Sequence, residues 1–274
     1  MFDAALPTPA ALMQDPAFAA ALRDCGEQPR TLPSSGLTLL HRRIGGMPVA
    51  MLPRAHPPST LSDDLHALGL HRTALILSPP TPCPMPRALR LRAPQPIAVI
   101  NLTAPTATRR AALHPKWRNQ LRCAEAANLR LTQAALPPDP RHPLLMAEAA
   151  QARTRRYANW PAPLTAAFAR VAPAQTHLFT AWQGRTPVAH MLFLCHGRSA
   201  TYHIGHISPA GRAVCAHNLL LWHASDCLAD RGFFQVDLGL LHSDSPGLTR
   251  FKRRAGAQVQ MTGGTWLRWT PLAR

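Results

Sequence analysis

The sequence predicts an α/β protein with a mixed, largely antiparallel sheet that is flanked by helices. Short apolar segments of strand length alternate along the chain with segments whose apolar residues recur at helical spacing. Over residues 177–207, strand-like segments are separated only by tight turns, which is typical of an antiparallel meander. The length of 274 residues is enough for one large domain or two small ones, with a sizeable core.

Residues 1–105 are expected to form the smaller of two α/β units. Gly45-Gly46 separates two short apolar segments and is a hairpin signal, and Ser62 or Asp63 could cap a short helix. Proline-rich stretches at 79–86 and 137–140 are interpreted as connections, because proline lacks the N–H that helices and sheets need. The expected elements are helices over 15–25 and 61–70 and strands over 37–43, 48–52, 73–78 and 97–102.

Residues 106–274 are expected to form the larger unit. It begins with a basic helical stretch over 106–128 that Pro115 interrupts. A polar loop over 208–212 leads into a long helix that Gly232 ends. The remaining expected elements are, in order, a strand over 129–135, helices over 142–157 and 161–171, strands over 177–183, 188–195 and 200–207, the long helix over 215–231, a strand over 234–238, a helix over 248–254 and a strand or hairpin over 258–269.

The chain is strongly basic and uses arginine for nearly all of its positive charge. Its formal net charge is +17, and of its 30 basic residues only Lys116 and Lys252 are lysine. This balance favours phosphate-bearing partners such as nucleic acid, nucleotide cofactors or anionic membrane surfaces. The arginines form no block, so a solvated basic surface fits equally well. A lysine kept in such a chain suggests a need for a compact point charge, with chance survival as the alternative.

The sequence also argues against several classes of protein. It contains no apolar run long enough to span a membrane, and its N-terminus lacks the layout of a signal peptide, so a cytoplasmic location is expected. The six cysteines are far apart and form no Cys-x-x-Cys pair, which argues against disulfides and structural zinc. His203 and His206 are expected to point to opposite faces of a strand, so no metal site is predicted. No nucleophile elbow is present.

Five segments carry motifs whose order and spacing resemble one known family. They are 114–125 (from His114-Pro115-Lys116-Trp117), 201–205 (Thr201-Tyr202-His203-Ile204-Gly205), 216–222 (from Ala216-His217-Asn218), 236–239 (Val236-Asp237-Leu238-Gly239) and 247–256 (with Phe251-Lys252-Arg253-Arg254). Together they resemble the GNAT acyltransferases, and in particular their FemAB-like branch. The resemblance covers about residues 113–267. Residues 1–105 match only loosely, as a reduced GNAT-like first half.

The resemblance implies transfer of an acyl or aminoacyl group from a carrier to an amine. The carrier is acetyl-CoA or another acyl-CoA in ordinary GNAT enzymes, and aminoacyl-tRNA in the peptidoglycan-bridging members. The leading expectation is an N-acyltransferase that uses acyl-CoA as co-substrate and a small-molecule or peptide amine as acceptor. Two alternatives stay open: an aminoacyl-tRNA-dependent aminoacyltransferase, and a non-catalytic basic protein of the same fold that binds RNA or another partner.

Three residues are candidates for catalysis. Lys252 resembles the lysine of the family's Phe-Lys motif, which lies near the reacting carbonyl, and it is expected to stabilise the developing oxyanion. His203 and Asp237 are candidate bases that could take the proton from the attacking amine. A structural role for His203 and an orienting role for Asp237 are the alternatives, since some members of the fold use no protein base.

Two further groups of residues are candidates for binding. A phosphate-bearing carrier needs the backbone N–H groups of a helix N-terminus and a cation, which Gly211, Arg212, His217 and Asn218 could supply. The loop has a single glycine where GNAT loops are richer, so an ordinary connection is the alternative. Lys116, Arg118 and Asn119 resemble the family's basic helix, and with Tyr202 they are expected to contact substrate; a solvated helix face is the alternative for that helix.

Overall fold

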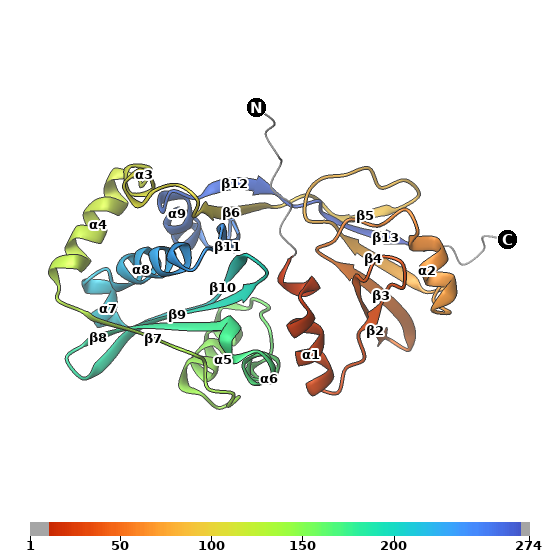
Figure 1. Cartoon of the computed structure of the whole chain (residues 1–274), viewed down its shortest axis with the longest axis horizontal. Coiled ribbons are helices and arrows are strands. Elements are labelled where there is room, and N and C mark those ends of the chain that lie inside the picture. Colours follow the sequence, from red (N-terminus) through yellow and green to blue (C-terminus); the bar gives the residue numbers. More distant parts are fainter. Residues whose placement is uncertain (1–10, 270–274) are drawn as a thin grey trace.

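The computed structural model describes residues 11–269, so the outer ends of both expected units lie outside the described residues. Figure 1 shows two sheets side by side, a larger one with helices on both faces and a smaller one beside it. Both sheets are mixed and largely antiparallel, and the expected α/β class is confirmed.

The smaller sheet has six strands in the order β1-β2-β3-β4-β13-β5. Only β3 and β4 pair in parallel among these described strands. Gly45 and Gly46 have φ of 57° and 82° in the β2–β3 turn, as the hairpin signal predicts. The bounds are β1 Arg30–Thr31, β2 Thr38–Ile44, β3 Met47–Pro53, β4 Ala74–Ser78, β5 Leu89–Arg92 and β13 Thr265–Arg268.

The larger sheet has seven strands in the order β12-β6-β11-β10-β9-β8-β7. Its described pairs are antiparallel except for β10 and β11. The expected meander is confirmed in β8, β9 and β10. The bounds are β6 Pro96–Asn101, β7 Arg130–Ala134, β8 Thr176–Gln183, β9 Thr186–His196, β10 Ser199–Ile207, β11 Gln235–Leu240 and β12 Gln258–Met261.

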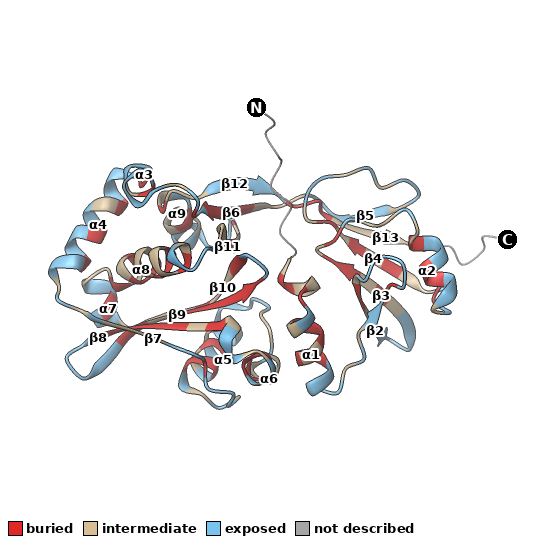
Figure 2. Cartoon of the chain, viewed as in Figure 1, coloured by how far each residue is buried: buried red, intermediate tan, exposed pale blue. Residues whose placement is uncertain are grey.

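Helices cover both faces of the larger sheet, and the buried residues in Figure 2 lie between these layers. One face packs against α4 (Pro115–Ala126), α8 (Ala216–Asp230) and α9 (Pro246–Arg254), around the buried Trp117 and Leu220. The other face packs against α1 (Pro16–Asp24), α5 (Pro143–Arg155) and α6 (Ala162–Val171), around the buried Phe168. The shorter elements are α2 (Leu61–Ala67), α3 (Thr106–Ala111), α7 (Pro209–Ala213) and the 3₁₀ turns Leu12–Gln14 and Pro173–Gln175.

The chain crosses between the two sheets, so a boundary at residue 105 does not separate them. β6, expected in the first unit, lies in the seven-stranded sheet, and β13, expected in the second, lies in the six-stranded sheet. Helix α1 also packs on α6, and Asp24 forms an ion pair with Arg170. Such pairings join distant parts of the chain, and local composition does not reveal them.

Two local expectations are corrected. Helix α2 begins at Leu61 with Thr60 at its N-cap, so neither Ser62 nor Asp63 occupies the cap. The segment expected as a loop over 208–212 contains α7, because the Ser208 hydroxyl accepts a hydrogen bond from the Gly211 N–H at 3.1 Å. No helix within residues 11–269 is long and apolar enough to cross a membrane.

Candidate active site where two parallel strands diverge

The seven-stranded sheet opens between β10 and β11. These strands pair at Ser199–Gln235, Ala200–Val236 and Thr201–Asp237, and their described pairing ends there. Strand β10 continues to Ile207 and β11 to Leu240, so both extend well beyond the last pair. Each strand has an irregularity at this point, between Tyr202 and Ile204 in β10 and between Asp237 and Leu240 in β11. The strands therefore diverge after Thr201 and Asp237, and we name this opening the splay.

Lys252 lies beside the end of β11. Its side chain is buried, with 6% of the residue exposed, and Nζ donates a hydrogen bond to the Leu240 carbonyl oxygen at 3.0 Å. Gly239 lies beside the ammonium: a Cβ on it would be 3.7 Å from Nζ, in ordinary van der Waals contact. Burial lowers the pKa of Lys252 to about 8, and the nearby Asp237 carboxylate acts in the opposite direction. The ammonium is therefore held in a poorly solvated position, where a charge acts strongly on its surroundings.

Asp237 is fixed at the last paired position of β11. One carboxylate oxygen accepts a hydrogen bond from the Gly239 N–H at 2.7 Å. The other lies 3.2 Å from Nη2 of Arg54, and the two side chains are 20% and 27% exposed. An arginine that follows β3 thus reaches across to the larger sheet and binds a carboxylate at the splay.

Arg54 is a candidate site residue that no sequence pattern predicts. It lies in the left-handed region at φ 51°, so its backbone conformation is unusual for an arginine. The Gln14 side-chain amide donates to the carbonyl oxygens of Pro53, at 2.7 Å, and of Thr38. Gln14 thereby holds the chain just before Arg54. No motif marks Arg54, and 183 positions separate it from Asp237.

Part of the sequence matches one known protein family. Residues 116–253 match the family described as "Acetyltransferase (GNAT) domain", and this match covers half of the chain. The chain belongs to the GNAT family. The comparison with curated proteins found no match.

Solved structures resemble this GNAT protein over nearly its whole length. FemX matches with a TM-score of 0.71 and 11% identity, covering 96% of this chain and 93% of that chain. The C-terminal domain of a putative lysylphosphatidylglycerol synthetase from Agrobacterium fabrum matches with a TM-score of 0.60 and 14% identity, covering 94% and 89%. L-PGS from Bacillus licheniformis matches with a TM-score of 0.56 and 11% identity, covering 93% and 91%. These likenesses confirm the FemAB-like, tandem GNAT-like fold, with residues before the GNAT domain included.

The GNAT domain places His203 on the face of β10 that packs against α5 and α6. Its Nε2 lies 3.0 Å from the Thr165 hydroxyl, and its ring packs edge-on against Trp160. Burial lowers the pKa of His203 to about 4, so the ring is neutral near pH 7.

The His206 side chain lies on the same face of β10 as His203. It pairs with His190 there, because the irregularity between Tyr202 and Ile204 shifts the alternation of side chains. The expectation that His203 and His206 face opposite ways is therefore wrong.

Tyr202 lies at the splay, next to the position that pairs with Asp237. Its ring packs on Phe193, and its hydroxyl lies over Gly205, where a Cβ would be 1.7 Å away. Burial raises the pKa of Tyr202, with a smaller contribution from the Glu148 carboxylate. Tyr202 therefore keeps its phenolic proton near pH 7.

The expected carrier-binding residues lie together after β10, but most have internal partners. A Cβ on Gly211 would lie 2.3 Å from the Val188 carbonyl oxygen, so this glycine allows α7 to pack on β9. His217 donates from Nε2 to the His206 carbonyl oxygen at 3.0 Å, and burial lowers its pKa to about 4. Asn218 donates to Gln120 of α4 at 3.4 Å. Arg212 is exposed, as a residue that meets a ligand phosphate could be.

The expected substrate-binding residues of α4 lie on its outer surface. Lys116 and Asn119 are exposed and Arg118 is half-buried, while Trp117 turns inward and packs against Phe251. Trp117 therefore links α4 to the helix that carries Lys252. The His114 side chain caps α4 by accepting from the Lys116 N–H at 3.2 Å.

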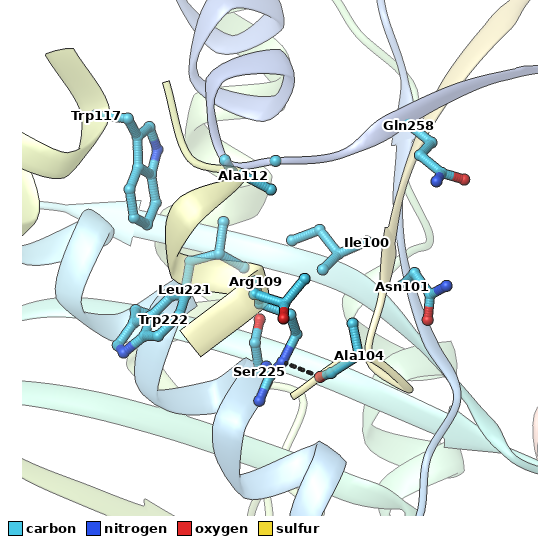
Figure 3. Close-up of a pocket in the computed structure, with 13 residues that line it drawn as sticks. Ile100, Asn101, Ala104, Arg109, Ala112, Trp117, Leu221, Trp222, Ser225 and Gln258 are labelled. Carbon is cyan, nitrogen blue, oxygen red and sulfur yellow. Dashed lines mark hydrogen bonds between the residues drawn. The ribbon is translucent and has the colours of Figure 1, made fainter. Parts of the chain in front are cut away.

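A cavity of about 160 Å³ lies between α3, α4, α8 and β6, at the opposite end of β11 from Leu240 (Figure 3). Arg109 forms one wall. It is held by Asp226 at 2.7 Å and by the Ala104 carbonyl oxygen at 3.1 Å, and its guanidinium lies 5.8 Å from the Trp222 ring centre. These contacts tie α3 to α8 and do not involve the splay. No group of three or more potential metal ligands occurs among the residues that the structure describes.

Proposed function

We propose that this protein transfers an aminoacyl group from aminoacyl-tRNA to an amine acceptor, with the reaction at the splay. The observation that carries the proposal is the Arg54–Asp237 contact at 3.2 Å, which brings the smaller sheet into the site of the GNAT domain. The similarity to FemX and L-PGS extends over both sheets and therefore supports a two-unit transferase rather than an isolated GNAT domain. The net charge of +17 suits a polyanionic carrier.

The proposed chemistry assigns a role to each group at the splay. The acceptor nitrogen attacks the ester carbonyl of the donor, a C–N bond forms, and the C–O bond to the tRNA breaks. The Lys252 ammonium stabilises the oxyanion that develops on the carbonyl, because a buried point charge is most effective where water is excluded. The amine proton leaves to the tRNA hydroxyl, directly or through Asp237. His203 stays a secondary candidate base, since its pKa of about 4 makes it a weak proton acceptor.

Acyl-CoA as the carrier is the second candidate. The N-cap of α8 is Cys215, in the left-handed region at φ 53°, and its side chain makes no capping hydrogen bond. No side chain therefore caps the N–H groups of Ala216 and His217, which could meet a phosphate after Arg212, while the Asn218 N–H already donates to the Cys215 carbonyl oxygen at 2.9 Å. The compact α7 and the packed Gly211 leave less room there than a glycine-rich loop would, which supports ranking this candidate second.

A non-catalytic basic protein remains the third alternative, and Lys252 argues against it. Burying an ammonium lowers its pKa and costs stability. A protein that binds RNA only through surface charge has no need for such a group.

A thermal-shift panel tests the carrier. The intact protein is heated with aminoacyl-tRNA, with deacylated tRNA and with acetyl-CoA or longer acyl-CoAs. A ligand at 100 times its Kd stabilises the folded state by about 2.7 kcal/mol. Stabilisation by aminoacyl-tRNA, followed by transfer of a labelled aminoacyl group to an amine, is the expected result. Stabilisation by acyl-CoA alone would move the assignment to the second candidate, and binding of both tRNAs without transfer would favour the third.

A further inference from the structure

A second cavity of about 260 Å³ opens between α5 and α6, the two helices that lie together on one face of the larger sheet in Figure 1. Ile204 of β10 forms part of its floor, three positions after the residue that pairs with Asp237. Thr165 and Trp160, which contact His203, also line it. The cavity is therefore next to the splay, on the face away from α8 and α9.

Glu148 is the one acidic residue among those that line this cavity, and it has no cationic partner in the part of the chain that the structure describes. The residue is 7% exposed and forms no ion pair within the part of the chain that the structure describes. One carboxylate oxygen accepts hydrogen bonds from the Tyr157 hydroxyl and from the Asn159 amide, both at 2.8 Å. Buried carboxylates are normally paired with a cation, because hydrogen bonds from neutral groups offset only part of the lost solvation.

This lack of a cationic partner is unexpected in such a basic chain. Thirty basic residues face 13 acidic ones, and exposed carboxylates such as Glu125 and Glu27 have arginine partners. Arg153 lines the same cavity, yet it is exposed and forms no ion pair with Glu148. The Glu148 side chain thus lines the cavity without a cationic partner among the described residues.

The walls of the cavity suit a small organic cation. Trp160 and Tyr157 present aromatic rings, which attract ammonium groups. Burial raises the pKa of Tyr157 to about 12, and the hydrogen bond to Glu148 acts in the same direction, so this hydroxyl stays a donor that holds the carboxylate in place. The alanines of α5 and α6, including Ala152, leave room for an alkyl chain.

We propose that this cavity binds an alkylammonium group of a substrate, with Glu148 as its counter-ion and Trp160 and Tyr157 as its aromatic walls. The inference rests on the proposed transfer reaction for its biological role. The amino group of an aminoacyl donor has this chemistry throughout the reaction, and the acceptor amine has it until it loses the proton that occupies its lone pair and can then attack. It makes Glu148 a binding residue, separate from the groups that act on the carbonyl.

Binding of a simple probe tests the chemistry without any assay of transfer. Calorimetry with the intact protein compares n-butylamine, which is protonated at pH 7, with the neutral 1-butanol. The amine is expected to bind and the alcohol to bind at least tenfold more weakly, because only the cation meets the carboxylate. Equal binding of the two, or no binding of the amine, would overturn the proposal.

Glu148→Gln is the decisive variant. The glutamine keeps an oxygen for Tyr157 and Asn159, so the fold is preserved while the charge is lost. Amine affinity is expected to fall at least tenfold.

Glu125→Gln is the matched control. It removes an exposed α4 carboxylate, paired with Arg110 at 2.8 Å, and should leave amine affinity unchanged. Ala152→Leu, which fills the cavity and keeps Glu148, should also weaken binding. Unchanged affinity in Glu148→Gln would overturn the assignment.

Two further readouts separate this inference from the proposed function. Carrier binding, measured by thermal shift, should be equal in wild type and Glu148→Gln if the acceptor amine is the ligand, and the KM for acceptor alone should rise. If the ligand is the donor's amino group, the KM for donor should rise instead. A protein that binds neither tRNA nor acyl-CoA but still binds the amine through Glu148 would refute the transfer reaction and leave the cation site intact.

Discussion

The two sheets of this protein contribute to the site in different ways. The seven-stranded sheet carries the splay, Lys252 and Asp237, and helices cover both of its faces. The six-stranded sheet contributes one described side chain, Arg54, held by Gln14 and bound to Asp237. The first contribution comes from contiguous motifs, and the second from one contact between distant residues. The comparison teaches that local sequence can indicate candidate site residues that lie within motifs, whereas it does not indicate a contact that another unit makes with them.

Lys252→Arg is expected to have the largest effect, because it changes the shape of the cation assigned to the proposed oxyanion. The guanidinium is a larger, planar fork, and we expect it not to fit where Nζ lies between the Leu240 carbonyl oxygen and Gly239. Loss of one such donor typically lowers the rate about 10²–10³-fold, roughly 2.7–4 kcal/mol. Single-turnover transfer by the folded variant measures this change in rate. A rate near wild type would remove Lys252 from the mechanism and leave both sheets as scaffold.

The pH dependence of stability provides a second test of Lys252. Its pKa is about 8 in the folded protein and 10.5 in the reference state, so between these values the unfolded chain binds the extra proton. Stability then rises with pH, and below pH 8 the buried ammonium destabilises the fold by roughly 3 kcal/mol. Lys252→Met should therefore be more stable than wild type in urea unfolding at pH 7, with a smaller advantage at pH 10. A constant difference at both pH values would show that the ammonium is well solvated.

The sequence predicts the elements well and their long-range pairing poorly. Gly45-Gly46 and Gly232 mark turns through local backbone preference, and the Phe251-Lys252 motif indicates a candidate lysine that the structure buries near Asp237. The irregularity after Tyr202, which turns His203 and His206 to one face, depends on packing against β9 and leaves no pattern in the sequence. Glu148 belongs to an ordinary helix, and only the fold shows that it lacks a cation.

Gly211→Ala is expected to destabilise the larger unit. The new Cβ would lie 2.3 Å from the Val188 carbonyl oxygen and 3.0 Å from the Ile207 side chain. Such overpacking costs about 1–3 kcal/mol, measured by chemical unfolding. Gly247→Ala is the control, because its Cβ would meet nothing within 4 Å and alanine favours a helix. Equal stability of the two variants would mean that α7 does not pack closely on β9 in solution.

Arg54→Ala tests whether the smaller sheet takes part in the reaction. Removing the guanidinium frees the Asp237 carboxylate, and transfer is expected to slow by about tenfold, which corresponds to roughly 1.4 kcal/mol. Arg42→Ala removes the partner of Glu27 from a pair whose side chains are 57% and 41% exposed, far from the splay, and should leave the rate unchanged. Equal rates in the two variants would reduce the six-stranded sheet to a structural support.

Lys116→Arg is expected to have the smallest effect, although Lys116 and Lys252 are the two lysines of this arginine-rich chain. Lys116 is exposed on α4, whereas Lys252 is 6% exposed. A solvated cation that meets a carrier phosphate acts mainly through its charge, and arginine supplies the same charge with additional donors. The rate and the tRNA affinity should therefore stay within about twofold of wild type, since exposed ionic contacts contribute about 0–1 kcal/mol. A loss as large as that of Lys252→Arg would show that Lys116 also contacts a single substrate atom, and the active site would then extend from the splay to the outer surface of α4.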